Sequence, residues 1–155
     1  MKASILYLSL KNWRRDTEMK VITLGEILLR LSTADDVRLK STKEFRVCYG
    51  GAEANVGISL AHFGHDVSVA TVLPQDNPLN DAVSSRLRMN GINTNLVATE
   101  YGRLGTYFLE QGNAGRATRV TYDRLYSSIS VLENLCWDLD EIFKGVDLLH
   151  ISGIL

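Results

Sequence analysis

Residues 49–57 read YGGAEANVG, a glycine pair followed within one helical turn by an asparagine. Two adjacent glycines, Gly50 and Gly51, stand directly before a segment with helical spacing, and Asn55 lies one turn inside it. Glycine loses much backbone entropy on folding, and asparagine is a poor residue for a helix interior. A chain that accepts both costs at one place needs a compensating role for them.

A ligand at the helix start would supply that role. Adjacent glycines let a ligand come close to the backbone, and the N–H groups of the first turn have no partner within the helix. We therefore expect a hydroxylated or anionic ligand, with the amide of Asn55 paired to a ligand hydroxyl. A tight turn followed by a helix that packs Asn55 against a backbone group explains the stretch equally well.

Two familiar nucleotide-binding patterns do not fit the spacing. The pattern G-x-G-x-x-G fails because the glycines are adjacent and the next one is Gly57. The phosphate-binding pattern G-x-x-x-x-G-K-[S/T] occurs nowhere in the sequence. The glycine pair is therefore not explained as a nucleotide site.

The surrounding segments alternate between strand and helix patterns. Apolar, β-branched runs predict strands, and apolar residues with helical spacing predict helices that end near Gly64, Gly91 and Gly145. This order predicts an α/β layer with a largely parallel sheet. The expected strands are 20–24, 66–73, 94–99 and 146–152, the last buried on both faces, and the expected helices are 52–64, 79–91 and 138–145.

A hairpin breaks this alternation. Thr106–Glu110 and Thr118–Arg124 are typical of two strands joined by a turn, and they suit a separate small sheet. Tyr122 and Arg124 are two residues apart and therefore share one face of their strand. With Tyr107 they suit a sugar acid, because aromatic rings cover C–H groups and a guanidinium binds a carboxylate with two hydrogen bonds. Taken one at a time, such residues are more often ordinary surface positions.

The composition fits one domain and argues against several partners. The chain has 155 residues and a net charge of −1, so it is not basic enough to predict binding to nucleic acid. Cys48 and Cys136 are far apart and are expected to be buried free thiols, and the three histidines form no ligand set. We therefore expect no metal site in this chain.

Residues 1–18 do not follow the pattern of the rest. Their apolar stretch is too short to cross a membrane and lacks an export cleavage site, whereas MKVITLGE from Met19 reads like a natural protein start. We interpret residues 1–18 as an extension outside the fold. We expect a cytoplasmic protein without a membrane contact.

Four stretches stand in order along the chain: MKVITLGEILLRLS, YGGAEANVGISLAHFG, RLGTYFLEQGNAGRATRVTYDRLYSSI and DLLHISGI. Together they resemble the PfkB, or ribokinase-like, family of carbohydrate kinases, with 2-keto-3-deoxygluconate kinases as the closest branch, and the resemblance covers residues 19–155. It implies a doubly wound α/β fold with a mostly parallel sheet and a small β-sheet lid, with lid strands around 28–49 and 104–124. In this family the lid closes over the sugar and often makes the contact of a homodimer.

The resemblance also implies which residues bind the sugar. Asn80 departs from the family pattern, where a glycine is usual, so the conformation of the turn there cannot be carried over. The residues that match sugar-binding positions are Gly50, Gly51, Asn55, Tyr107, Tyr122 and Arg124, and Leu28 and Ile154 match positions that line the pocket more weakly.

In this family the C-terminal half carries the G-A-G-D stretch with the catalytic aspartate, and it also carries the ATP pocket and the acidic Mg²⁺ site. This sequence contains none of these parts. We therefore expect the N-terminal, substrate-binding part of an ATP-dependent kinase for 2-keto-3-deoxygluconate or a similar sugar acid. By itself it should have no catalytic residue, bind no ATP or Mg²⁺, show no activity and tend to associate. Two alternatives stay open: a fructokinase or another hexose kinase of the family, and a non-catalytic module that binds sugar or forms dimers.

Overall fold

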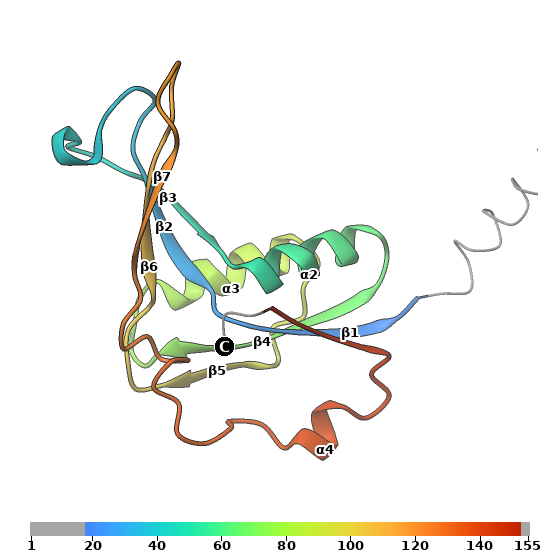
Figure 1. Cartoon of the computed structure of the whole chain (residues 1–155). Coiled ribbons are helices and arrows are strands. Elements are labelled where there is room, and N and C mark those ends of the chain that lie inside the picture. The colour runs from blue at the N-terminus through green and yellow to red at the C-terminus, as the bar shows by residue number, and fades with distance from the viewer. Residues whose placement is uncertain (1–17, 153–155) are drawn as a thin grey trace, which may run out of the picture.

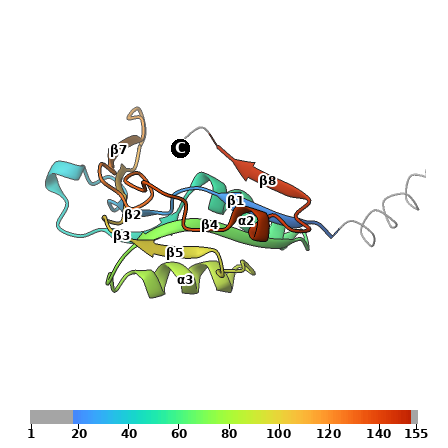
Figure 2. The same cartoon turned by 90° about the horizontal axis from the view of Figure 1, so that it is seen from below.

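The computed structural model describes residues 18–152, which form two four-stranded sheets (Figure 1). The first sheet is parallel throughout, and Figure 2 shows its strands in the order β5-β4-β1-β8. Valine-rich and isoleucine-rich runs favour strands buried in such a sheet. The predicted α/β fold with a largely parallel sheet is confirmed. The strands are β1 (Lys20–Leu24), β4 (Asp66–Pro74), β5 (Val97–Glu100) and β8 (Leu148–Ile151).

The second sheet, which we call the lid sheet, has the order β3-β2-β6-β7 and confirms the predicted hairpin. β6 and β7 pair antiparallel as that hairpin, β2 and β3 also pair antiparallel, and β2 and β6 pair parallel in the middle. A 3₁₀ turn, η1 (Leu39–Ser41), lies between β2 and β3. The strands are β2 (Leu28–Ser32), β3 (Arg46–Gly50), β6 (Thr106–Glu110) and β7 (Arg119–Asp123), so β7 ends one residue before Arg124.

The two longer helices cover one face of the parallel sheet, and the segment with the third helix lies on the other side (Figure 1). The two long helices are each followed by a glycine with positive φ, Gly64 at 92° and Gly91 at 78°. This left-handed conformation ends a helix and suits glycine, as predicted. The helices are α2 (Ala52–His62), α3 (Asn80–Met89) and α4 (Leu139–Ile142).

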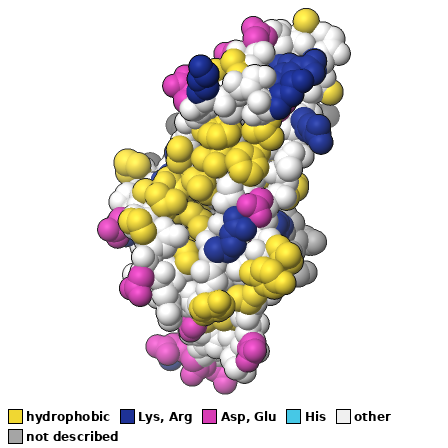
Figure 3. All heavy atoms as spheres, turned by 90° about the vertical axis from the view of Figure 1, so that its left-hand side faces the viewer, with side chains coloured by type: hydrophobic (Ala, Val, Ile, Leu, Met, Phe, Trp, Pro, Cys, Tyr) yellow, Lys and Arg dark blue, Asp and Glu magenta, His cyan; other side chains and the backbone are white. Residues whose placement is uncertain are grey.

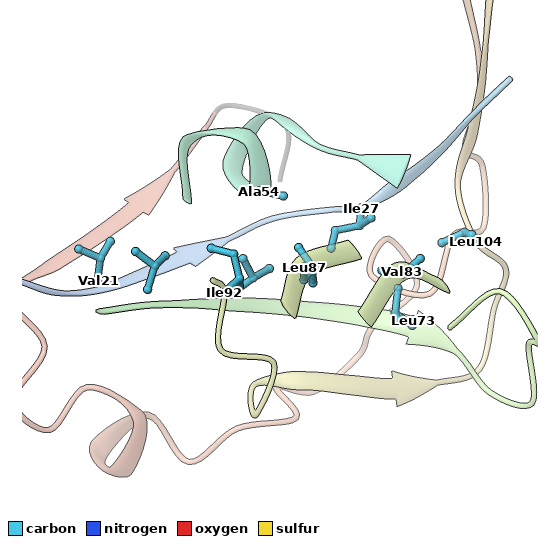
Figure 4. Packing of buried hydrophobic residues seen from close by; sticks show 10 residues of the cluster. Val21, Ile27, Ala54, Leu73, Val83, Leu87, Ile92 and Leu104 are labelled. Carbon is cyan, nitrogen blue, oxygen red and sulfur yellow. The ribbon is translucent and has the colours of Figure 1, made fainter. Parts of the chain in front are cut away.

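The core lies between the parallel sheet and the helices α2 and α3 (Figure 4). Val21 and Leu73 on the strands and Val83 on α3 are fully buried. Burial of one such side chain contributes about 1.5–3 kcal/mol, so this cluster fixes the helices on the sheet. Its members are Val21, Ile27, Ala54, Val67, Val69, Leu73, Val83, Leu87, Ile92 and Leu104.

The prediction that strand 146–152 is buried on both faces is wrong. β8 pairs on one side only, with β1, and Leu148, Leu149 and Ile151 are 41%, 39% and 46% exposed. An apolar run predicts that a strand can be buried, but an edge strand is buried only where other elements cover it. Within residues 18–152, β1 is its only strand partner.

Asn80, the residue that departs from the family pattern, closes the turn between β4 and α3. Its side-chain amide donates to the carbonyl oxygen of Pro74 at 2.7 Å, and its backbone N–H donates to the carbonyl oxygen of Asn77 at 3.0 Å. The substitution therefore supplies a local hydrogen bond that a glycine could not make.

The strand order locates the site. In an open parallel sheet, ligands bind beyond the carboxyl ends of the strands, where the connections of neighbouring strands diverge. β1 lies between β4 and β8, and it continues through Gly25 and Glu26 into the lid sheet, while β8 brings Ser152 to the same edge. The lid sheet stands at this end of the parallel sheet (Figure 1).

Candidate functional site

The glycine pair packs directly against the connection that leaves β1. Gly51 precedes α2 with an extended backbone at φ −156°, and a Cβ at this position would overlap the carbonyl oxygen of Glu26. Glycine is therefore required here because a side chain would not fit, and not because the φ angle excludes other residues. This close approach brings the N-terminus of α2 to the carboxyl end of β1.

A cavity of about 110 Å³, which we call the site cavity, lies between the start of α2 and the lid sheet. Four of the residues that line it were predicted from the sequence, and four others were not. Two of the described lining residues are arginines, and none is an aspartate or a glutamate. The predicted residues are Gly50, Gly51, Asn55 and Tyr107, and the missed ones are Arg30, Cys48, Tyr49 and Arg86.

One row of side chains crosses the whole lid sheet beside the site cavity. Cys48 lies opposite Arg30, Arg30 opposite Tyr107, and Tyr107 opposite Tyr122. Residues directly opposite each other in neighbouring strands share one face of the sheet. The ring centroids of Tyr107 and Tyr122 are 5.8 Å apart, with the ring planes tilted by 41°. The structure thus brings the two predicted tyrosines together.

Among residues 18–152, the guanidinium of Arg30 has Cys48 and Tyr107 as neighbours and no carboxylate partner. A hydrogen bond with Cys48 raises the pKa of Arg30, burial opposes this, and the neighbouring Tyr107 raises it again. The Nε of Arg30 is buried without a hydrogen-bond partner in residues 18–152. The ion pairs found in that part of the chain involve Arg103, Arg116 and Arg124 instead.

Arg124 follows β7 and forms an ion pair with Glu26. The Glu26 side chain is 4% exposed and that of Arg124 is 28% exposed, so the pair is largely removed from water. The ion pair joins the end of the lid hairpin to the second residue after β1. Arg124 is absent from the lining of the site cavity and instead borders a second, mostly apolar cavity of about 450 Å³. Within residues 18–152, the carboxylate that Arg124 faces is that of Glu26.

A second buried carboxylate, Glu53, ties α2 to β8. Glu53 is 1% exposed and lies in the first turn of α2, where the helix dipole favours a negative charge. Its Oε1 accepts a hydrogen bond from the backbone N–H of Ser152 at 3.2 Å and another from the Ser152 hydroxyl. A Cβ on Gly25 would overlap the Glu53 carboxylate, so a glycine is required there. The ends of β1, β8 and α2 are therefore held together.

The remaining predicted residues lie near the site or beyond the described part of the chain. Leu28 is buried and lies opposite Gly50 in the lid sheet. Ile154 lies outside the described residues. The position of Arg30 could have been found from the alternation of Leu28, Arg30 and Ser32, because these residues share one face of a strand. No periodic signal in the sequence points to Glu26.

Residues 18–152 contain no group of three or more His, Cys, Asp or Glu side chains arranged to hold a metal ion. In the same part of the chain, none of the helices has the length and apolar character needed to cross a membrane. Cys48 and Cys136 are free, as predicted, but both are only half-buried.

The parallel sheet, the lid sheet at the carboxyl end of β1 and the glycine-led helix define a ribokinase-like α/β fold. The family model described as pfkB family carbohydrate kinase matches residues 18–155. The chain belongs to this family, which confirms the resemblance found in the sequence.

Three relatives illustrate the likeness. The 2-dehydro-3-deoxygluconokinase of Thermotoga maritima is 47% identical with a TM-score of 0.82, over 88% of this chain and 41% of that one. The 2-dehydro-3-deoxygalactonokinase of Haloferax volcanii is 32% identical over 111 residues, which are 72% of this chain and 35% of that protein. The uncharacterized sugar kinase PH1459 of Pyrococcus horikoshii, solved in complex with ATP, is 21% identical with a TM-score of 0.59, over 68% of this chain and 35% of that one, and shows the shared fold alone. This chain thus spans 35–41% of the length of these relatives.

Proposed function

We propose that the chain forms the substrate-binding part of an ATP-dependent kinase that phosphorylates 2-keto-3-deoxygluconate or a closely similar sugar acid. The observation that carries this proposal is the charge of the site cavity, whose described lining has two guanidinium groups and no carboxylate. A neutral hexose has little use for such a lining, whereas a sugar acid neutralises it. The names of the relatives from Thermotoga maritima and Haloferax volcanii, both kinases of 2-dehydro-3-deoxy sugar acids, support the same substrate class.

The predicted residues take complementary roles in this proposal. Gly51 and Asn55 bind hydroxyl groups at the N-terminus of α2, and the paired rings of Tyr107 and Tyr122 cover the carbon chain. Arg124 binds the carboxylate, which must share the guanidinium with Glu26 or displace that side chain. Gly50 lines the site cavity, whereas Leu28 and Ile154 are included because they match positions that line the pocket in the family.

The reaction places clear demands on these residues. The primary hydroxyl oxygen of the sugar acid forms a bond to the γ-phosphorus, the bond from that phosphorus to the oxygen of ADP breaks, and the hydroxyl loses its proton. Phosphoryl transfer depends mainly on positioning and on neutralising phosphate charge, which ATP-bound Mg²⁺ supplies in part. We assign the positioning of the hydroxyl to this chain and assign no catalytic base or ATP contact to its residues.

The test compares an acid with a neutral sugar in the full-length protein. Because Arg124→Ala also leaves Glu26 unpaired, we place the substitution in a Glu26→Gln background. The loss of a desolvated charge-assisted contact is about 2–5 kcal/mol, so kcat/KM for 2-keto-3-deoxygluconate should fall by roughly 30-fold or more. Arg124→Lys should recover part of the loss, and kcat/KM for fructose should change little. Equal losses for both sugars, or none, would show that the sugar-acid assignment is wrong.

We also propose that the lid sheet forms the contact of a homodimer. Phe45 and Val47 are 37% and 54% exposed at the lid sheet, and the ring centroids of Phe45 and Phe108 are 5.8 Å apart. Figure 3 shows hydrophobic side chains gathered on the side of the molecule where the lid sheet stands. Light scattering should give a dimer that Val47→Lys dissociates, while Val56→Lys on α2 leaves it intact. A monomeric full-length protein would rule this contact out.

A further inference from the structure

Arg30 occupies the centre of the row of side chains that crosses the lid sheet. It lies between Cys48 on β3 and Tyr107 on β6, and all three line the site cavity together with Asn55. The resemblance to the family did not single out Arg30. The proposed function uses only the summed charge of the cavity lining, to which Arg30 contributes, and assigns the carboxylate of the ligand to Arg124.

The charge of Arg30 is not neutralised by the described part of the chain. None of the ion pairs within residues 18–152 includes it, and its Nε is buried without a hydrogen-bond partner there. The other guanidinium of the cavity, Arg86, already donates from Nε to the carbonyl oxygen of Tyr49 at 3.1 Å. A partly buried guanidinium that has no carboxylate partner gains most from a ligand that brings an anionic oxygen.

Arg124 differs from Arg30 in this respect. Its guanidinium is already paired with the buried carboxylate of Glu26, so an incoming anion must compete with a group of the protein. Arg30 has no such competitor among residues 18–152. An anion that enters the site cavity therefore meets two guanidinium groups, Arg30 and Arg86, that have no carboxylate partner among residues 18–152. Of the two, Arg30 is the one whose buried Nε has no hydrogen-bond partner there.

We propose that Arg30 is a specificity-determining residue that binds an anionic group of the ligand, a carboxylate in the sugar acid, in addition to the contact made by Arg124. The identity of the ligand as a sugar acid rests on the proposed function, whereas the preference of the site cavity for an anion does not. Arg30 contributes two kinds of selection. Its charge attracts the acid, and its unpaired Nε penalises a ligand that leaves it without an acceptor.

The thiol of Cys48 reports on this charge because it lies beside Arg30 in the same cavity. Alkylation of the full-length protein by iodoacetate, an anion, is compared with alkylation by the neutral iodoacetamide, and the rate constants are measured at each cysteine by mass spectrometry. Both reagents attack the same thiolate, so the ratio of their rates cancels any change in the ionisation of the thiol. Cys136, which the chain places near Glu100 instead, is the internal control.

We expect Arg30→Gln to lower the iodoacetate-to-iodoacetamide ratio at Cys48 by about 5-fold or more, because one nearby positive charge is lost. Arg30→Lys, which keeps the charge, should hold the ratio within about 2-fold of wild type, and the ratio at Cys136 should not change in either variant. Circular dichroism verifies that both variants are folded. A ratio at Cys48 that is the same in wild type and Arg30→Gln overturns the inference.

Protection of Cys48 by ligand separates this inference from the proposed function. We expect 2-keto-3-deoxygluconate to slow alkylation by iodoacetamide, and Arg30→Gln to require at least about 10-fold more of it for half protection. Equal protection of wild type and variant overturns the role of Arg30 and leaves the sugar acid as substrate. The third outcome is an iodoacetate-to-iodoacetamide ratio at Cys48 that depends on Arg30, while 2-keto-3-deoxygluconate gives the wild type no protection. This outcome upholds the anion site and counts against the sugar acid as the ligand.

Discussion

Replacement of Arg124 by alanine should destabilise the fold, because it removes the partner of a buried carboxylate. The Glu26 side chain is 4% exposed, so its charge would remain in a poorly solvated place without compensation. Loss of one partner of a buried ion pair costs about 3–5 kcal/mol. Since the Arg124 side chain is 28% exposed, solvent screens part of this cost, and we expect a loss of about 2–3 kcal/mol in the free energy of unfolding.

Thermal and urea unfolding at low protein concentration, followed by circular dichroism, measures this effect. For a domain of this size, 1 kcal/mol corresponds to about 2–4 °C in Tm, so Arg124→Ala should lower Tm by roughly 4–12 °C. Adding Glu26→Gln to Arg124→Ala should restore a large part of the lost Tm, because the unpaired charge of Glu26 is then gone. The double-mutant cycle should give a coupling free energy of at least about 1 kcal/mol.

The matched control is Arg103→Ala. Arg103 donates two hydrogen bonds to the carboxylate of Asp123 at 2.9 and 2.8 Å, but both side chains are exposed, at 43% and 49%. An exposed pair contributes little to stability, so Tm should shift much less than in Arg124→Ala. Equal losses of stability in Arg103→Ala and Arg124→Ala would show that burial of the Glu26–Arg124 pair has no special effect. So would losses in free energy of unfolding for Glu26→Gln and Arg124→Ala that simply add in the double variant.

Three further predictions follow from the structure. Gly51→Ala should lower the free energy of unfolding, measured in urea, by about 1–3 kcal/mol, because the added Cβ overlaps the Glu26 carbonyl oxygen. Gly115→Ala is the control and should leave the urea midpoint unchanged, because the space around Gly115 is open. The hydrogen bonds from Arg103 lower the pKa of Asp123 below its ordinary 3.8. The stabilisation of the fold by this pair is therefore present above pH 3.8 and is lost as the pH falls through the lowered pKa. In an NMR titration, Arg103→Ala should move the titration midpoint of Asp123 upward, and an unmoved midpoint would contradict the pairing. The exposed apolar side chains of β8 should make the 155-residue chain associate, and Leu149→Lys should reduce its apparent mass in light scattering. Monodisperse monomers for both the unchanged chain and the Leu149→Lys variant would refute the prediction of association.

The sequence by itself determined the fold class, because the signals that specify it are local. β-branched runs, helical spacing and helix-ending glycines such as Gly64 and Gly91 each act within a few residues of chain, and their order predicts the parallel sheet. The hairpin was predictable for the same reason. The glycine pair at Gly50 and Gly51 indicated where the site cavity lies, and the order of four motifs indicated the family.

The tertiary structure decided what each of these local features contacts. The partner of Arg124 is Glu26, nearly a hundred residues earlier, and the reason for Gly51 is the Glu26 carbonyl oxygen; neither contact leaves a periodic trace in the sequence. The apolar run of β8 could not predict its exposure, because exposure depends on what covers the edge of the sheet. Arg30 joins Cys48, Tyr107 and Tyr122 only through strand register, which long-range pairing fixes. Local propensity therefore sets the elements, while the distribution of charge at the site follows from contacts between segments far apart in the chain.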